Sequence, residues 1–485
     1  MLKLFHREKN KRERMPQGNR EILVITYVFI AAFLSLIFYL LYFTQFVGHD
    51  LINNPYNKRQ DLYAKRVTRG DILSRDGEIL ATTLTDENGM EVRTYPYGNL
   101  FAHAVGFSTH GRTGVESFEN FNLLTSDVYI GERIANDFAG EKSPGNKVVT
   151  TFDLYMQQVA DVSLGDRRGA VIATDVKTGE ILVLLSKPDF DPNTIRLRWD
   201  EINADSDRSA LLNRVSMGLY PPGSTFKVVT ALAYMKEHAD TDDYSFDCNG
   251  SFTYQGNRIN CFHGQHHGTV DFHTSFAKSC NSSFANIATT LNKRSFTTVC
   301  NDLLFNNRLP CPYSYKQSVV TMNAGSNIAD VMQTAIGQGK TQITPFHMNL
   351  ITQAIANNGV MMRPYAVSGI YTAYDDPVEE TGQEEFTRLL QVKYAKKMQE
   401  MMEEVVTEGT GSKVRDTYGY KAAGKTGSAE YSADKGRSHA WFTGFAGVDE
   451  PEIAVTVLVE DGGSGGEVAV PIAKNVFDAY FGSRQ

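Results

Sequence analysis

The segment Tyr220-Pro221-Pro222-Gly223-Ser224-Thr225-Phe226-Lys227 joins a turn to a helix. Its prolines and glycine predict the turn, and the apolar run 228–234 that follows predicts a buried helix. Ser224 then lies at the start of the helix, and Lys227 lies one turn later on the same face. A neighbouring base makes a serine hydroxyl nucleophilic, and a lysine can be that base if burial and nearby cations lower its pKa. Taken alone, the pattern also fits an N-cap serine followed by a surface lysine.

Two later segments favour the catalytic interpretation. Ser279-Cys280-Asn281 offers a hydroxyl that can relay a proton and an amide that can hold a peptide carbonyl. Lys425-Thr426-Gly427-Ser428 comes just before the last apolar runs of the chain. Its lysine supplies a fixed positive charge, and its glycine lets a substrate lie against a strand edge. This ordered set of motifs is typical of β-lactamases and penicillin-binding proteins.

The chain resembles class B penicillin-binding proteins over nearly its whole length. Besides the three motifs, five segments are similar to that family: 69–77 (RGDILSRDG), 213–214 (NR), 336–339 (IGQG), 409–411 (GTG) and 441–444 (WFTG). The resemblance implies a D,D-transpeptidase that attacks the D-Ala-D-Ala end of a peptidoglycan stem peptide. It implies an acyl-enzyme at Ser224, release of D-alanine, transfer to an amine on a neighbouring strand, and covalent inhibition by β-lactams.

The resemblance also assigns the site residues. The implied catalytic set is Ser224, Lys227, Ser279, Asn281, Lys425 and Thr426. Gly427 and Ser428 are expected to contact the substrate, and the backbone N–H groups of Ser224 and Ser428 are expected to hold the oxyanion. No cofactor is expected to take part in catalysis.

Sequence patterns predict an α/β (α+β) fold. Strands are predicted at 147–151, 170–174, 181–185, 440–445 and 453–459, and helices at 154–164, 391–408 and 470–481, with helical patterns dominating 225–358. Early strands, many helices and late strands indicate one antiparallel sheet flanked by helices. The family implied by the resemblance has this architecture, the serine penicillin-recognising transpeptidase fold.

The N-terminus predicts a single membrane anchor. Residues 1–21 form a basic tail, and residues 22–47 carry no charge. As a helix this stretch is about 39 Å long, enough to cross a ~30 Å hydrocarbon core. A buried core helix would show a polar face, and a signal peptide would end in a small-residue cleavage site. An uncleaved anchor places the tail in the cytoplasm and everything after residue 48 outside the membrane.

The remaining chain divides into a small pedestal domain, residues 48–143, and a catalytic domain, residues 144–485. The pedestal stretch is polar and rich in turn signals. It is too short for the glycosyltransferase domain of the family's class A members. By resemblance, the expected partner is therefore a multi-spanning glycosyltransferase of the shape, elongation, division and sporulation family, joined through the anchor and the pedestal around Arg69.

Other functions are less consistent with the sequence. The net charge of −8 argues against nucleic acid as a partner. Residues 419–426 match the phosphate-loop pattern, but a phosphate loop must open a helix, and the residues after Thr426 start a helix poorly. A non-catalytic β-lactam sensor would need a signalling module. A β-lactamase usually lacks an anchor and a pedestal.

The cysteines indicate a metal site. Cys248, Cys261, His267 and Cys280 offer three thiolates and one imidazole, a set that suits tetrahedral Zn²⁺ in a structural role. Some class B enzymes of the elongation type resemble this arrangement. The alternatives are a Cys248–Cys261 disulfide or buried free thiols, with His263 or His266 as substitute ligands. The other two cysteines, Cys300 and Cys311, are expected in the core or paired with each other.

Overall fold

The computed structural model describes residues 17–43, 62–238, 240–415, 418–431 and 437–483, which form two units, 1–58 and 59–485. The first unit contains α1 (Gln17–Tyr42). Its part Arg20–Tyr42 is long and apolar enough to cross a membrane, and none of it is buried. The helix thus starts before the predicted boundary at Ile22, whereas residues 44–47 of the predicted anchor lie outside the described residues.

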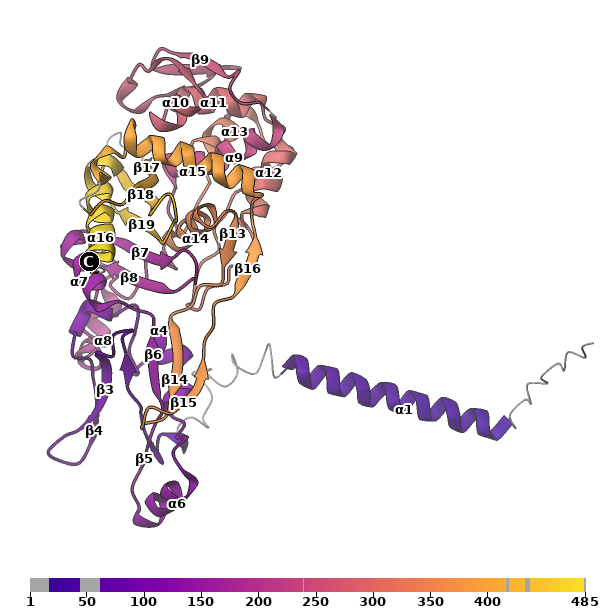
Figure 1. The fold of residues 1–485 in the computed structure, drawn as a ribbon, viewed down its shortest axis with the longest axis vertical. Helices are drawn as coiled ribbons and strands as arrows, with labels where there is room; N and C mark the ends of the chain where they lie inside the picture. Colours follow the sequence, from indigo (N-terminus) through magenta and orange to yellow (C-terminus); the bar gives the residue numbers. More distant parts are fainter. Residues whose placement is uncertain (1–16, 44–61, 239, 416–417, 432–436, 484–485) are drawn as a thin grey trace, which may run out of the picture. The chain divides into compact units, whose positions relative to one another are not determined.

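The second unit begins with a mixed sheet that carries the pedestal (Figure 1). Its strand order is β15-β14-β6-β2-β3-β4. The strands are β2 (Ile72–Leu73), β3 (Ile79–Thr85), β4 (Glu91–Thr94), β6 (Lys147–Thr150), β14 (Val367–Tyr371) and β15 (Pro377–Glu380). Strands from residue 367 onward therefore complete a sheet that begins near residue 72. Around it lie β1 (Val67–Thr68), β5 (Ser143–Pro144), α4 (Gly114–Phe118), α5 (Asn120–Leu123) and α6 (Ile130–Ala139).

The catalytic part is built on a five-stranded antiparallel sheet. Its order is β17-β18-β19-β7-β8, with β17 (Ala422–Glu430), β18 (Ser438–Ala446), β19 (Ile453–Val459), β7 (Gly169–Asp175) and β8 (Ile181–Lys187). Successive residues of a strand point to opposite faces. Val171 and Ala173 accordingly pack with α7 (Leu154–Leu164) and α16 (Val470–Gly482), whereas Ala170 and Ile172 pack with α9 (Lys227–Glu237) and α14 (Pro345–Ala356). Each face of the sheet is thus covered by helices.

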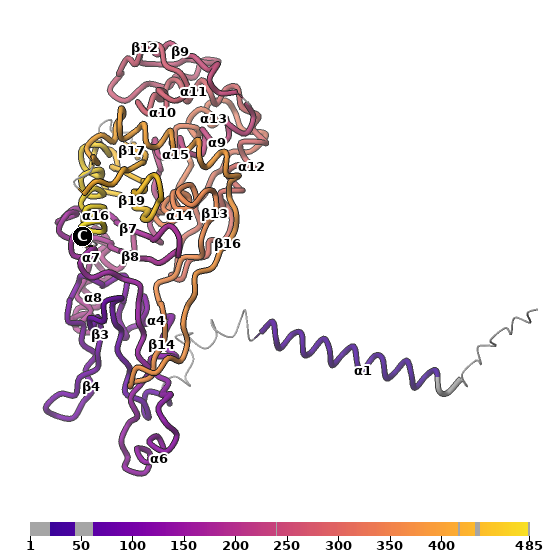
Figure 2. Tube along the Cα trace, viewed as in Figure 1, coloured from indigo at the N-terminus to yellow at the C-terminus, as the bar shows by residue number. Residues whose placement is uncertain are grey.

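The predicted strands and helices of this part are confirmed, and helices dominate 225–358 as predicted, but that stretch also contains four short strands that the sequence did not indicate. Within 225–358, where helices were expected to dominate, the chain forms β9 (Ser245–Cys248), β10 (Ser251–Tyr254), β11 (Asn257–Asn260) and β12 (Gly268–Asp271). Strands β10 and β11 form a hairpin whose turn residues, Gln255 and Gly256, both have positive φ. Strands β9 and β12 pair with each other, beside α10 and α11 (Figure 2).

Helices do occupy the rest of that stretch. They are α10 (Phe272–Ala277), α11 (Asn281–Thr290), α12 (Lys293–Asp302), α13 (Ile328–Ala335) and α14. The remaining elements of the unit are α8 (Ile195–Ala204), β13 (Val360–Met362), β16 (Glu385–Arg388) and α15 (Val392–Thr407). Helices α10, α11 and α15 pack near β17 and α9, so the segments that carry the three predicted motifs converge at one end of the sheet.

Candidate active site

The first motif has the geometry expected from the sequence. Residues Gly223–Phe226 form a single 3₁₀ turn (η3), and Lys227 is the first residue of α9. Gly223 has φ +54°, which favours glycine, and its N–H donates to Gly337 O at 2.9 Å. Ser224 is half-buried and lines a cavity of about 360 Å³, while Lys227 is fully buried. The turn therefore presents the serine to the cavity and places the lysine beneath it.

Lys227 holds the second motif in place. Its Nζ donates to Ser279 O at 2.6 Å, to Asn281 Oδ1 at 2.7 Å and to Ser279 Oγ at 3.1 Å. Burial lowers the pKa of Lys227 to about 8, although the nearby thiols of Cys280 and Cys261 act in the opposite direction. Among the described residues no hydrogen bond joins Ser224 Oγ to Lys227. Such bonds are often long in unliganded enzymes and tighten in the complex.

Lys425 of the third motif contacts the Ser279 hydroxyl of the second motif, as Lys227 does. Lys425 of β17 is fully buried, and its Nζ donates to Ser279 Oγ at 3.0 Å and to Thr426 O at 3.2 Å. Burial, and then the charge of Lys227, lowers the pKa of Lys425 well below its usual range. Ser279 Oγ thus accepts hydrogen bonds from two lysines. Because a hydroxyl has two acceptor lone pairs and one proton, its proton is left to point toward the cavity.

The strand β17 forms one wall of the cavity. It is the edge strand of the sheet, and Thr426, Gly427 and Ser428 all line the cavity. A Cβ at Gly427 would lie 3.1 Å from Pro222 O, so a larger residue would crowd the turn that carries Ser224. Thr426 Oγ1 lies 2.5 Å from Thr410 Oγ1, which also lines the cavity. An extended peptide can add to such an edge as a further strand.

The four predicted metal ligands come together beside the active site. One ligand atom from each of Cys248, Cys261, His267 and Cys280 lies within 4.8 Å of the others. Cys248 Sγ is 3.5 Å from Cys261 Sγ and 3.4 Å from His267 Nδ1. Strand pairing explains the meeting, since β9 ends at Cys248 and β12 begins at Gly268. His263 and His266 do not belong to this cluster.

All five cysteines are free thiols in the structure. Cys300 is buried in the core, and Cys311 packs against the same core, so the expected core position is confirmed. The alternative in which these two cysteines pair with each other was wrong. Burial raises the pKa of both thiols to about 12.

The cysteine cluster is linked to the second motif through Cys280, as its position between Ser279 and Asn281 predicts, and also through a contact that the sequence did not indicate. Asn281 Nδ2 donates to Asn260 O at 3.1 Å, and Asn260 directly precedes Cys261. Cys280 caps α11 by accepting a hydrogen bond from Ser283 N at 3.4 Å. The residue before Cys261 therefore holds the Nδ2 side of the Asn281 amide, and Lys227 holds its Oδ1 side. A backbone carbonyl leaves no residue-type signal, so only the position of Asn260 next to Cys261 could have indicated it.

The structure also excludes the phosphate-loop interpretation. A phosphate loop places its glycine-rich segment at the start of a helix. In this chain the residues from Ala422 to Glu430 form strand β17, which pairs along its length with β18. The lysine and threonine of the pattern therefore belong to a strand and not to a loop that opens a helix.

The site places a serine at a helix start beside two buried lysines that share one hydroxyl. An open strand edge lies next to them. This combination is that of a serine acyltransferase of the penicillin-recognising class. The family model "penicillin binding protein transpeptidase domain" matches residues 169–478, and "penicillin binding protein A dimerisation domain" matches residues 69–148. The chain belongs to the penicillin-binding protein family, among its class B members, and is a serine-type transpeptidase.

Relatives and solved structures agree with this assignment. The peptidoglycan D,D-transpeptidase PbpA of Mycolicibacterium smegmatis is 31% identical, covering 88% of this chain and 92% of its own. A ceftriaxone acyl-enzyme of penicillin-binding protein A from M. tuberculosis superimposes with a TM-score of 0.79 at 29% identity, covering 87% of this chain and 99% of its own. The D,D-transpeptidase domain of a peptidoglycan glycosyltransferase from Eggerthella lenta gives 0.78 at 26% identity, with coverage of 86% and 99%.

Proposed function

We propose that Ser224 is the nucleophile through which this D,D-transpeptidase cross-links peptidoglycan stem peptides. One observation carries the assignment of roles: Ser279 Oγ accepts from both Lys227 and Lys425 in the cavity that Ser224 lines. This arrangement supplies a base for the nucleophile and a proton donor for the leaving group. The described residues of the site need no cofactor for either role.

In the acylation step, Ser224 Oγ attacks the carbonyl carbon between the two D-alanines while the neutral amine of Lys227 takes its proton. The resulting oxyanion is held by the backbone N–H groups of Ser224 and Ser428. When the C–N bond breaks, the departing D-alanine nitrogen takes a proton from Ser279 Oγ, which regains one from a neighbouring lysine. The products are the Ser224 ester and free D-alanine.

In the second step, an amine of a neighbouring stem peptide attacks the ester carbonyl and loses its proton to the same group of bases. The bond to Ser224 Oγ breaks, Oγ regains its proton, and a new amide joins the two strands. Thr426 is suited to hold the substrate carboxylate, because its hydroxyl lines the cavity together with that of Thr410, whereas the buried Lys425 holds Ser279 Oγ. A β-lactam follows the first step only, which gives covalent inhibition.

Labelling with a fluorescent penicillin tests this proposal. We expect Ser224→Ala to abolish covalent labelling while the protein stays folded, and intact-mass and peptide mapping of the wild type to place the adduct on Ser224. Ser412→Ala is a matched control, because Ser412 borders the same cavity but belongs to none of the three motifs. Full labelling of the Ser224→Ala protein would place the nucleophile elsewhere.

We also propose that Cys248, Cys261, His267 and Cys280 bind a structural Zn²⁺. The residues fit the ion, because three buried thiols and one imidazole surround one point and this donor set is typical of structural zinc. The ion supplies stability to the segment that carries Ser279 and Asn281, and it takes no part in the acyl transfer.

We propose a single-pass membrane location with the N-terminus in the cytoplasm. This organisation comprises the tail 1–21, the anchor 22–47, the pedestal 48–143 and the transpeptidase domain 144–485. The apolar helix Arg20–Tyr42 supports an anchor, and the membership of the family supports a catalytic domain outside the membrane. The proposed partner is the multi-spanning glycosyltransferase named above, because a transpeptidase without its own polymerase must act on strands that another enzyme makes.

A further inference from the structure

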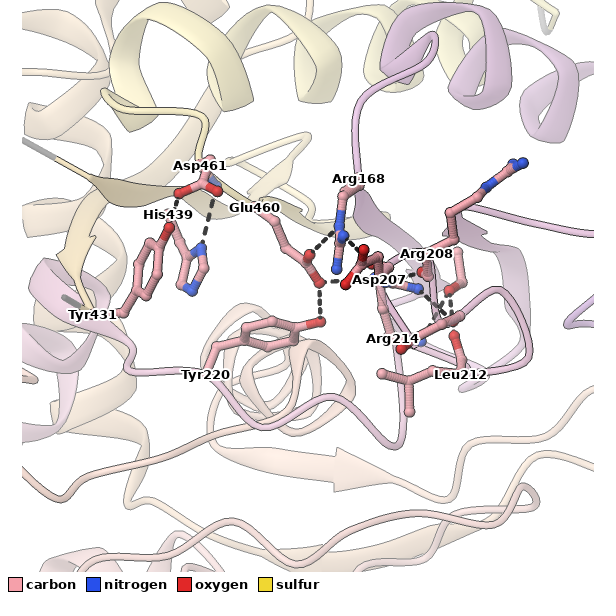
Figure 3. A network of polar contacts seen from close by, with 12 residues as sticks. Arg168, Asp207, Arg208, Leu212, Arg214, Tyr220, Tyr431, His439, Glu460 and Asp461 are labelled. Carbon is pink, nitrogen blue, oxygen red and sulfur yellow. Dashed lines mark hydrogen bonds and ion pairs between the residues drawn. The ribbon is translucent and has the colours of Figure 1, made fainter. Parts of the chain in front are cut away.

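A carboxylate far along the sequence from the three motifs is tied to the segment that carries Ser224. Glu460 is the residue after β19, and its side chain is only 12% exposed. Its Oε1 accepts hydrogen bonds from Arg214 Nε and from the Tyr220 hydroxyl, both at 2.8 Å. Its Oε2 accepts one from Arg168 Nε at 2.8 Å (Figure 3). One carboxylate therefore binds three side chains.

Arg214 and Tyr220 are the two ends of the segment that leads to Ser224. The Arg214 side chain is 1% exposed, and it also donates to Arg208 O at 2.9 Å and Ser209 O at 3.2 Å. Burial alone would raise the pKa of Glu460. The charge of Arg214, together with the hydrogen bonds that the Glu460 carboxylate accepts, lowers that pKa. The carboxylate thus stays ionised and keeps all of its hydrogen-bond partners.

Tyr220 is fixed on its other sides by the sheet. Its ring meets His439 edge-on at 5.4 Å and Trp441 at 6.3 Å between ring centres. Its backbone N–H donates to Ile343 O at 3.0 Å. Among the described residues, Glu460 is the one hydrogen-bond partner of its hydroxyl. Burial raises the pKa of Tyr220, so the hydroxyl remains protonated and donates.

Hydrogen bonds also hold the turn that joins Tyr220 to the nucleophile Ser224. Trp441 Nε1 donates to Pro221 O at 3.1 Å, and Thr225 Oγ1 donates to Pro222 O at 2.8 Å. With the Gly223–Gly337 bond described above, every residue from Tyr220 to Gly223 has a fixed partner. A shift of the Tyr220 ring would therefore move the turn that carries Ser224 rather than be absorbed by a flexible loop.

We propose that Glu460 is a positioning residue for acylation, which fixes the place of Ser224 Oγ through Arg214 and Tyr220. The inference rests on Ser224 being the nucleophile, as proposed above. Acyl transfer requires the attacking oxygen at near-bonding distance from the carbonyl carbon, and displacements of about 1 Å can cost about 100-fold in rate. Glu460 touches neither substrate nor the reacting atoms, so its effect should fall on the acylation rate and not on binding.

Tyr220→Phe tests the proposal most cleanly, because it leaves the charges of Glu460 and Arg214 paired. We expect the acylation rate constant for a chromogenic cephalosporin, measured in the full-length protein by stopped flow, to fall about 10- to 100-fold. The dissociation constant of the non-covalent complex and the melting temperature should change little. Glu460→Gln keeps an acceptor for the tyrosine hydroxyl, and we expect it to acylate faster than Glu460→Ala.

Arg168→Gln is the matched control. Arg168 binds the same carboxylate, but its side chain is 46% exposed, and in the part of the chain that the structure describes it makes no hydrogen bond to the segment 214–223. We expect its acylation rate to match the wild type. A normal rate in Tyr220→Phe, an equal loss in Arg168→Gln, or a loss that merely follows the folded fraction would each overturn the positioning role. Peptide mapping of the wild-type adduct separates the two proposals, because an adduct away from Ser224 contradicts the proposed nucleophile itself.

Discussion

At the scale of single residues, the site depends on two lysines that are buried together. Two ammonium groups that donate to one hydroxyl repel each other, and burial penalises both charges. Burial lowers the pKa of both lysines, in the direction that a general base needs, and the charge of Lys227 lowers the pKa of Lys425 further. Phe284 and Phe276 lie 5.4 and 5.5 Å from the two ammonium groups, which keeps the pair dry while offering weak cation–π stabilisation.

The lowered pKa of Lys227 gives a prediction for pH dependence. Only the neutral amine can accept the proton of Ser224, and its fraction rises with pH through the pKa of about 8. We expect the acylation rate constant to increase about tenfold between pH 7 and pH 9, with its midpoint near pH 8. Lys227→Ala should lose acylation almost as completely as Ser224→Ala, because nucleophile and base act as a unit. A rate that is flat or falls across this range would contradict the assignment of the base.

At this scale the sequence predicted the chemistry well and the geometry only in part. Ser224, Lys227, Asn281 and Lys425 could be found because each motif combines rare residue types in a fixed order. The shared role of Ser279 Oγ could not be predicted, because it depends on strand β17 packing against α10 and α11. Glu460 was also missed, since a single glutamate after an apolar strand carries no motif.

At the scale of elements, the signature at 69–77 has a structural explanation. Arg69 Nε and Arg93 Nε donate to the fully buried Glu116 carboxylate at 2.6 and 2.7 Å. Gly70 is required because a Cβ there would lie 1.9 Å from Asn146 O. Arg69 therefore faces the inside of the pedestal and holds α4 against the sheet.

We predict that Glu116→Gln destabilises the protein strongly. The substitution keeps the shape of the side chain but leaves two buried guanidinium groups without their counter-charge, which costs about 3–5 kcal/mol. Urea unfolding of the full chain in detergent measures the effect. Arg198→Gln is the control, because the Arg198–Glu201 pair is exposed, and its loss should leave the unfolding transition unchanged. An equal transition in both variants would contradict the structural role.

For the cysteine cluster, the sequence predicted the residues that meet but not the strands that position them. The sequence predicted the four ligands, but it did not predict the two strand pairs that bring them together. A turn at Gln255-Gly256 and short polar strands lack the apolar alternation by which strands are recognised. The meeting of these four residues could still be predicted, because metal-binding residue types are informative without any knowledge of the backbone.

We predict about one equivalent of zinc in the purified protein by elemental analysis. Cys248→Ser should lower zinc content, melting temperature and penicillin acylation together, although Cys248 belongs to none of the three motifs, because a structural zinc contributes directly to folding free energy. Cys300→Ser is the matched control, since Cys300 is equally buried but lies outside the cluster.

The alternatives for this cluster give different results. A Cys248–Cys261 disulfide predicts no zinc and a loss of stability only under reducing conditions. Free thiols predict neither metal nor redox dependence. Metal-free protein that acylates at the normal rate and melts at the same temperature would contradict the zinc proposal.

At the scale of the whole molecule, the pedestal and the catalytic part are joined by a shared sheet. Strand β14 leaves the catalytic part and pairs with β6 on one side and with β15 on the other, while β6 pairs in parallel with β2 (Figure 1). The predicted boundary at residue 143 marks a change in sequence character, but the chain crosses it again at 367–380. Sequence patterns describe local elements, and a strand that returns after more than two hundred residues leaves no local signal.

The last prediction concerns the proposed membrane partner. We expect the full-length protein, extracted from membranes in mild detergent, to co-purify with a multi-spanning glycosyltransferase that can be identified by mass spectrometry. A variant in which residues 17–43 are replaced by an unrelated apolar helix of equal length should remain in the membrane and keep penicillin labelling, but it should recover less of the partner. This comparison separates anchoring from recognition, because both proteins cross the membrane and only one offers the native helix surface. Repeated absence of a glycosyltransferase from the wild-type preparation would contradict the partnership, whereas equal recovery with both helices would place the interface in the pedestal alone.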